Sequence, residues 1–171
     1  MDYKSYIREV PDFPKPGILF YDITTLLKEP ICLRAIIDEL VRKYQGAGIT
    51  KVVGIESRGF ILGSPLAYHL NAGFVPVRKP GKLPADVFEV NYNLEYGSNS
   101  LSIHRDAIQG GESVLILDDL LATGGTAAAT AHLVRQIGGK IAGMGFLVEL
   151  LGLEGRKKLD GHAVHSLISY D

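Results

Sequence analysis

Two patterns of apolar residues alternate along the chain, a helical spacing and short unbroken runs. Apolar residues recur every three or four positions between Pro30 and Gly46, which predicts an amphipathic helix. Further helices are predicted over residues 60–70 and from the glycines at 124–125 to Ile137. Short apolar runs between these helices predict buried strands over residues 51–55, 74–79, 113–117, 140–150 and 163–170.

Strands that alternate with helices predict an α/β fold, with a mostly parallel, twisted sheet flanked by helices on both faces. Right-handed crossovers place the carboxyl ends of parallel strands at one edge of such a sheet, where ligands bind. We therefore expect a site near the turns that follow Ile55, Lys79, Leu117 and Glu149. We expect a single domain over residues 1–171.

Two segments depart from this alternation. Residues 88–96 place apolar side chains at every second position, which predicts a half-buried strand. This strand is expected to pair with residues 101–105 across a turn at residues 97–99, forming an antiparallel hairpin. Residues 12–24 are rich in proline and glycine near their start, so we expect an irregular but ordered arm there.

Composition narrows the class of protein without naming a function. Of the 171 residues, 46% are hydrophobic and 22% are charged, and the net charge is −1. These values fit a soluble enzyme or binding domain, and they give no general attraction to nucleic acid or to a membrane surface. Cys32 is the single cysteine, so no disulfide forms within the chain. The N-terminus has no apolar signal core, and we expect a cytoplasmic protein.

The stretch "LILDDLLATGGTAAAT" (residues 115–130) joins a predicted strand to a predicted helix through the sequence "ATGGT" at residues 122–126, here called the glycine turn. Gly124 and Gly125 allow the backbone to approach an anion closely, and two threonines add hydroxyl donors. The first turn of the following helix attracts a phosphate. The lysine of a P-loop and the three glycines of a dinucleotide fingerprint are both missing here.

Asp118 and Asp119, here called the acid pair, precede the glycine turn and would repel a bare phosphate. A sugar phosphate resolves this conflict, because its hydroxyl groups can donate to the carboxylates while its phosphate lies over the turn. The carboxylates could also stabilise a cationic ribose in a transition state, or hold magnesium through water. The structural alternative is an acid that caps the helix beside a solvated neighbour.

The sequence "LILDDLLATGGT" resembles the phosphoribosyl-diphosphate (PRPP) binding motif of type I phosphoribosyltransferases. The resemblance extends to "FPKPGILFYDITTLLKEP", "ESRGFILGSPLA", "RKPGKLP", "NLEYG" and "LVELLGLEGRKKL", which are similar to the adenine-specific branch of that family. It implies transfer of the phosphoribosyl group of PRPP to N9 of adenine, giving AMP and pyrophosphate. It also implies Mg²⁺ carried by PRPP, a homodimer, a base-binding hood within residues 1–30 and a hairpin lid over residues 78–105.

The resemblance also assigns site residues. The 5′-phosphate would bind at Ala122, Thr123, Gly124, Gly125 and Thr126, and the ribose hydroxyls at Asp118 and Asp119. Pyrophosphate would bind at Ser57 and Arg58, in a loop that has a cis peptide in the family, and at Arg78, Lys79 and Lys82. Glu95 would lie near the adenine ring, and the backbone of Leu19, Phe20 and Tyr21 would hydrogen-bond the base. With Glu95, the residues expected to act in catalysis are Arg58, Asp118 and Asp119.

Several alternatives stay open at this level. Arg58 could pair with Glu56 or another surface acid, and the basic turn at residues 78–82 could be solvated surface. Tyr21 stands where the family usually has arginine. The acceptor could be hypoxanthine, guanine, xanthine or orotate, or the protein could be a regulator that senses PRPP. His162 and His165 are three positions apart on a predicted strand, so we expect no direct metal ligands from this pair.

Overall fold

The computed structural model describes residues 1–94 and 97–171, with side chains described outside residues 93–98. The chain divides into two compact units, an N-terminal unit (Met1–Glu39) and a C-terminal unit (Leu40–Asp171). Helix α2 (Pro30–Tyr44) begins in the first unit and ends in the second. Each unit is described by itself below.

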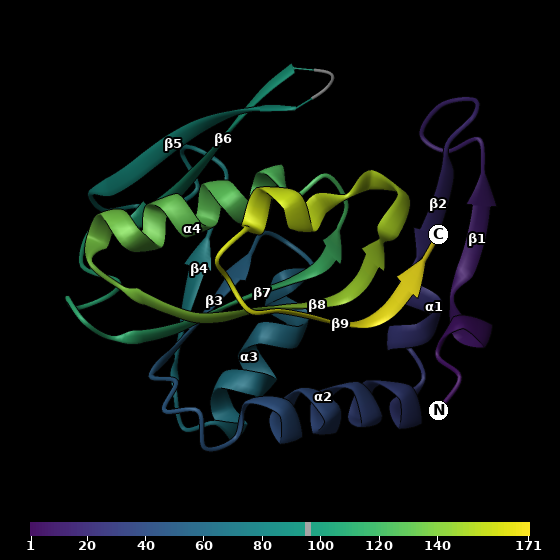
Figure 1. The fold of residues 1–171 in the computed structure, drawn as a ribbon, viewed down its shortest axis with the longest axis horizontal. Helices are drawn as coiled ribbons and strands as arrows, with labels where there is room; N and C mark the ends of the chain where they lie inside the picture. The colour runs from purple at the N-terminus through teal and green to yellow at the C-terminus, as the bar shows by residue number, and fades with distance from the viewer. Residues whose placement is uncertain (95–96) are drawn as a thin grey trace. The chain divides into compact units, whose positions relative to one another are not determined.

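Within the described residues, the C-terminal unit contains a five-stranded sheet with the order β4-β3-β7-β8-β9 (Figure 1). Every neighbouring pair in this sheet is parallel. The strands are β3 (Lys51–Ile55), β4 (Gly73–Val77), β7 (Ser113–Leu121), β8 (Lys140–Leu150) and β9 (Val164–Tyr170). The predicted α/β fold with a mostly parallel sheet is therefore confirmed.

Two helices of this unit cover the sheet. Helix α3 (Gly59–His69) packs on β3 and β7, and α4 (Gly125–Ile137) packs on β7 and β8 from the other face (Figure 1). Because both faces of the central strands are covered, β7 and β8 carry continuous buried runs rather than alternating ones. This covering explains why the strand signal in the sequence is a run of apolar residues.

The antiparallel hairpin is present, but its turn differs from the prediction. Strand β5 (Val87–Leu94) pairs with β6 (Gly97–His104), and the pairing continues until Leu94 lies opposite Gly97. Residues 97–99, predicted as the turn, therefore belong to β6. The register follows from pairs of apolar residues, since Phe88 lies opposite Ile103 and Val90 opposite Leu101.

The N-terminal unit contains a second hairpin that the sequence analysis described only as an irregular arm. Strand β1 (Arg8–Pro11) pairs antiparallel with β2 (Leu19–Asp22). Arg8 binds the carboxylate of Asp22 at 2.6 Å, and the ring of Phe13 meets that of Phe20 edge to face. Short helical segments, η1 (Lys4–Tyr6) and α1 (Thr24–Leu27), flank the hairpin.

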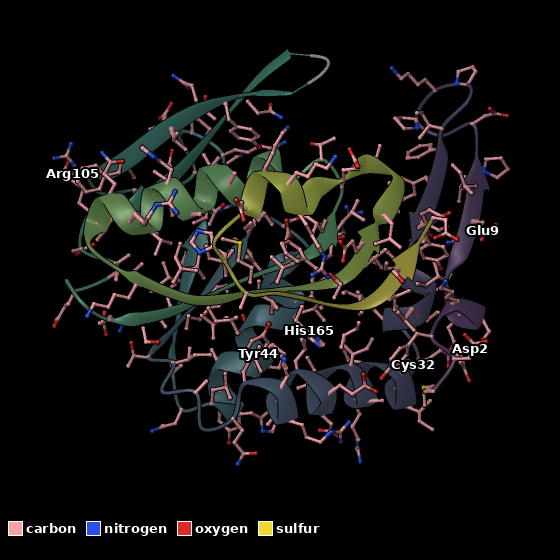
Figure 2. The ribbon with its side chains drawn as sticks, in the orientation of Figure 1. Asp2, Glu9, Cys32, Tyr44, Arg105 and His165 are labelled. Atoms are coloured by element: carbon pink, nitrogen blue, oxygen red, sulfur yellow. The ribbon has the colours of Figure 1, made fainter. Side chains whose placement is uncertain are left out.

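The end of α2 is attached to the sheet of the C-terminal unit through Tyr44. Its hydroxyl donates to the carbonyl oxygen of Met144 at 3.3 Å, and its ring meets that of His165 edge to face (Figure 2). Burial raises the pKa of Tyr44 to about 12. After β8 the chain forms two 3₁₀ segments, η2 (Leu151–Leu153) and η3 (Gly155–Leu159). None of the helices in the described part of the chain is long and apolar enough to span a membrane.

Candidate active site

A cavity of about 510 Å³ opens at the carboxyl ends of β3 and β7 in the C-terminal unit. This is the edge of the sheet at which a site was expected. Its lining comes from the end of β3 and the loop after it, from the turn after β4, from the hairpin, and from the acid pair through the start of α4. The lining residues are Ile55, Glu56, Ser57, Arg58, Lys79, Tyr92, Asn99, Ser100, Leu101 and residues 118–127.

The acid pair belongs to strand β7 rather than to the turn that follows it. The strand was predicted to end at Leu117 but continues to Leu121, because β8 keeps pairing with it as far as Glu149. Asp119 is 6% exposed, and its backbone N–H donates to Oδ1 of Asp118 at 2.9 Å. The rigid sheet therefore holds both carboxylates at the cavity wall.

Desolvation and mutual repulsion make two negative charges on the acid pair unfavourable. Asp118 is accessible from the cavity while protein atoms enclose its other sides, and this desolvation raises its pKa well above the usual value. The charge of Asp119 raises the pKa of Asp118 further. Burial also raises the pKa of Asp119, although Arg58 opposes the shift. Hydroxyl donors or a cation would relieve this repulsion.

The glycine turn joins β7 to α4 on the cavity wall. Gly124 has φ of +77°, a left-handed conformation that suits glycine, and α4 begins at the next residue. The amide groups of the first turn of a helix lack partners within it and carry the positive end of its dipole. Thr123 and Thr126 also line the cavity. The turn can therefore offer an anion both backbone and hydroxyl donors.

The loop after β3 brings Ser57 and Arg58 to the same cavity. The Glu56–Ser57 peptide bond is cis, as the resemblance implies. Nε of Arg58 lies 2.6 Å from Oδ2 of Asp119, so this arginine pairs with a member of the acid pair and not with Glu56. The ion pair joins the two groups of residues that the sequence analysis assigned to pyrophosphate and to ribose.

Glu56 instead organises the basic turn after β4. It accepts hydrogen bonds from Nε and Nη2 of Arg78, at 3.3 and 3.1 Å, and from the backbone N–H of Lys79 at 3.0 Å. These bonds from Arg78 hold the pKa of Glu56 below its usual value. A third nitrogen of Arg78 donates to the carbonyl oxygen of Lys82. Among the described residues that line the cavity, Lys79 is present but Arg78 and Lys82 are not.

The hairpin contributes residues that the sequence analysis did not assign to the site. Tyr92, Asn99, Ser100 and Leu101 line the cavity, and the hydroxyl of Tyr92 lies 3.2 Å from Oγ1 of Thr126. The alternation of β5 placed Tyr92 among apolar positions and gave no reason to expect a polar contact. Glu95, expected near adenine, lies outside the described residues.

The residues expected to bind adenine lie in the N-terminal unit. Leu19, Phe20 and Tyr21 are consecutive residues of β2, and Leu19 is exposed. Burial raises the pKa of the Tyr21 hydroxyl, and the charge of Glu9 on the paired strand adds to this effect. Their backbone groups alternate between pairing with β1 and facing away from it, as in any two-stranded ladder.

The carboxylate donors of this cavity suit a magnesium ion. Within the described residues, no group of three metal-ligating side chains comes together. The acid pair supplies carboxylate oxygens, which are the hard donors that Mg²⁺ prefers, and Mg²⁺ commonly binds through one or two carboxylates plus substrate phosphates.

At the carboxyl edge of this parallel sheet, one strand ends in the acid pair and is followed by the glycine turn. This arrangement defines a class of enzyme that acts on sugar phosphates. The phosphoribosyl transferase domain family matches residues 22–169, and the chain belongs to this family. The adenine phosphoribosyltransferase of Solibacter usitatus is 59% identical over 99% of this chain and 98% of its own length.

Solved structures agree with this assignment. Adenine phosphoribosyltransferase from Thermoanaerobacter pseudethanolicus superposes with a TM-score of 0.95 at 51% identity, covering 99% of this chain and 98% of its own. The enzyme from Saccharomyces cerevisiae, complexed with an imino-altritol bisphosphate and adenine, gives a TM-score of 0.89 at 41% identity. That match covers 95% of this chain and 94% of the yeast chain.

Proposed function

We propose that this protein transfers the 5-phosphoribosyl group of PRPP to N9 of adenine, releasing AMP and pyrophosphate for purine salvage. The observation that carries the proposal is the acid pair at the end of β7, directly before the glycine turn in one cavity. Full-length similarity to adenine phosphoribosyltransferases supports adenine as the acceptor base.

Asp118 and Asp119 accept hydrogen bonds from the ribose hydroxyls, and their negative charge stabilises the ribose cation that develops as the bond at C1′ breaks. The 5′-phosphate binds at the glycine turn, at residues 122–126, which fixes the other end of the sugar. Held between these contacts, C1′ is oriented for attack by N9 of the base. The acid pair and the glycine turn, on one rigid wall of the cavity, therefore supply most of the orientation of the sugar.

Arg58 has two tasks in this proposal. Before PRPP binds, it pairs with Asp119 and lowers the cost of the buried carboxylate. When PRPP binds, its ribose hydroxyl groups replace Arg58 as the partners of Asp119. Arg58 then binds the pyrophosphate together with Ser57 and Lys79. Arg78 contributes by holding Glu56, which in turn accepts a hydrogen bond from the backbone N–H of Lys79, and Lys82 also binds the pyrophosphate.

The remaining assignments follow the family resemblance. Glu95 holds or exchanges a proton of the purine, and the backbone of Leu19, Phe20 and Tyr21 reads its amino edge. The hairpin within residues 78–105 closes as a lid that keeps water from the ribose cation. Residues 1–30 act as the base-binding hood, and both units work as one catalytic domain over residues 1–171.

Asp118 and Asp119 would hold, through water, the Mg²⁺ that PRPP carries. The ion would supply positive charge to the pyrophosphate as it departs. We further propose a cytoplasmic homodimer. Ile61 and Tyr68 are exposed apolar side chains of α3, and Tyr68 is 82% exposed, which suits a surface covered by a second copy. Sedimentation velocity tests the dimer.

Product formation tests the reaction. PRPP and Mg²⁺ are offered with adenine, hypoxanthine, guanine, xanthine or orotate in separate reactions, and nucleotides are quantified by chromatography. We expect AMP from adenine and no product from the other bases. Nucleotide from another base would overturn the choice of acceptor, and PRPP binding without any nucleotide would indicate a regulator.

A further inference from the structure

The segment after β8 has no part in the reaction described above, although "LVELLGLEGRKKL" (residues 147–159) carries part of the family resemblance. Glu149 lies near the end of β8, opposite Leu121, the last residue of β7. The glycine turn begins at the residue after Leu121. Glu149 is only 3% exposed, and a buried carboxylate is costly unless a cation neutralises it.

Arg156 of η3 supplies that cation with two parallel hydrogen bonds. Its Nε and Nη2 each lie 2.6 Å from one carboxylate oxygen of Glu149. These bonds hold the pKa of Glu149 below its usual value. The third nitrogen, Nη1, donates to the carbonyl oxygen of Val164 at 3.1 Å. Arg156 therefore ties η3 to the end of β8 and to the start of β9.

The residue before Arg156 lies against the back of the glycine turn. A side-chain carbon added at Gly155 would overlap the carbonyl oxygen of Ala122, and one added at Gly124 would overlap the carbonyl oxygen of Gly155. Only glycine at both positions allows the two backbones to approach so closely. Segment η3 also packs beside α4, which begins at the glycine turn (Figure 1). Movement of Gly155 would therefore move the turn.

We infer that the Glu149–Arg156 ion pair positions the glycine turn for the 5′-phosphate. It holds Gly155 against Ala122 and Gly124, so that the amide groups of the turn keep the arrangement that binds a phosphate. Glu149 and Arg156 are positioning residues, because they act through the backbone of Gly155. The inference rests on the proposed function, which assigns the turn to the 5′-phosphate.

A double variant separates positioning from stability. Arg156→Met alone leaves the charge of Glu149 buried and unpaired, so it is expected to lower the melting temperature. Glu149→Met with Arg156→Met replaces both charged groups by apolar side chains of similar volume, so this variant should melt close to the wild-type temperature. We expect its KM for PRPP to rise about tenfold, while its KM for adenine stays unchanged.

Two single variants complete the test. Arg156→Lys keeps the positive charge but cannot make two parallel bonds, so it should fold and also raise the KM for PRPP. Lys157→Met is the matched control, because it removes the exposed Lys157–Glu154 ion pair from the same segment. It should leave both KM values unchanged.

Calorimetric titration with ribose 5-phosphate measures the turn without the reaction. The expected result is binding about tenfold weaker in the double variant than in the wild type. A folded double variant, or Arg156→Lys, that binds ribose 5-phosphate and PRPP as tightly as the wild type would overturn the inference. If the wild-type protein binds ribose 5-phosphate but forms no AMP, the proposed function fails, and the titration still decides the role of the ion pair.

Discussion

At the scale of single residues, the acid pair shows that this site is built at a cost to stability. Asp118 and Asp119 are adjacent carboxylates in a largely enclosed position, and desolvation and mutual repulsion raise the pKa of Asp118. Ionisation of such a carboxyl group lowers the free energy of unfolding. The proposed reaction therefore needs a negative charge that lowers the stability of the folded protein.

Asp118→Asn should stabilise the protein and impair the reaction. Because the folded-state pKa is raised, the destabilisation by Asp118 is absent below its unfolded pKa and grows as the pH rises. We expect the variant to gain about 1 kcal/mol in unfolding free energy at about pH 7 and nothing below about pH 4. Its kcat/KM for PRPP should fall about 100-fold.

Urea unfolding at several pH values, with steady-state kinetics, measures both effects. Asp106→Asn is the control, since Asp106 is an exposed acid outside the cavity lining. A variant that is less stable than the wild type at neutral pH would contradict this account of the acid pair.

At the scale of elements, apolar runs predicted the sheet well because packing on both faces leaves an unmistakable signal in β3, β7 and β8. The end of β7 was missed because aspartate has a low preference for strands, and only pairing with β8 extends the strand through the acids. The strands of the N-terminal arm were missed because proline and glycine near β2 obscured a short hairpin held by contacts such as Arg8 with Asp22.

The site residues also fall into two groups, those that a local sequence motif predicts and those that only the folded chain brings together. The acid pair and glycine turn are local in sequence, so their motif could be read directly. The pairing of Glu56 with Arg78, and of Arg58 with Asp119, joins separate elements and leaves no local pattern. Tyr92 lies among apolar positions of β5, so its contact with Thr126 could be found only from the folded chain.

The hairpin contacts the glycine turn through Tyr92, so Tyr92→Phe should weaken PRPP binding. Loss of one hydrogen bond of about 1 kcal/mol corresponds to a roughly fivefold higher KM for PRPP. The melting temperature should change little, because the ring remains. Tyr6→Phe serves as the control in the N-terminal unit. If Tyr92→Phe left the KM for PRPP at the wild-type value, the contact would have no role in binding.

At the scale of the whole molecule, individual acids in the two units contribute to stability with opposite pH dependence. The acid pair of the C-terminal unit has raised pKa values. In the N-terminal unit, hydrogen bonds from Thr24 and then from Arg8 lower the pKa of Asp22 to about 2. Stability from Asp22 is therefore present above its unfolded pKa and is lost as the pH falls toward 2.

Asp22→Asn should destabilise the protein near neutral pH by about 1 kcal/mol, a value discounted because the Arg8 side chain that binds it is exposed. The difference from the wild type should shrink as the pH falls from about 4 to about 2. Thermal unfolding over this pH range measures it. A difference that stayed constant with pH would show that the Asp22 charge does not contribute.

The most direct test of the central claim is the balance of products from PRPP and adenine with Mg²⁺. AMP, pyrophosphate and ribose 5-phosphate are measured together in wild type and in Asp118→Asn. The account predicts AMP and pyrophosphate in equal amounts, little ribose 5-phosphate, and a large loss of both main products in the variant. Pyrophosphate with ribose 5-phosphate and no AMP, or equal activity of the two proteins, would contradict the assignment of the reaction to this cavity.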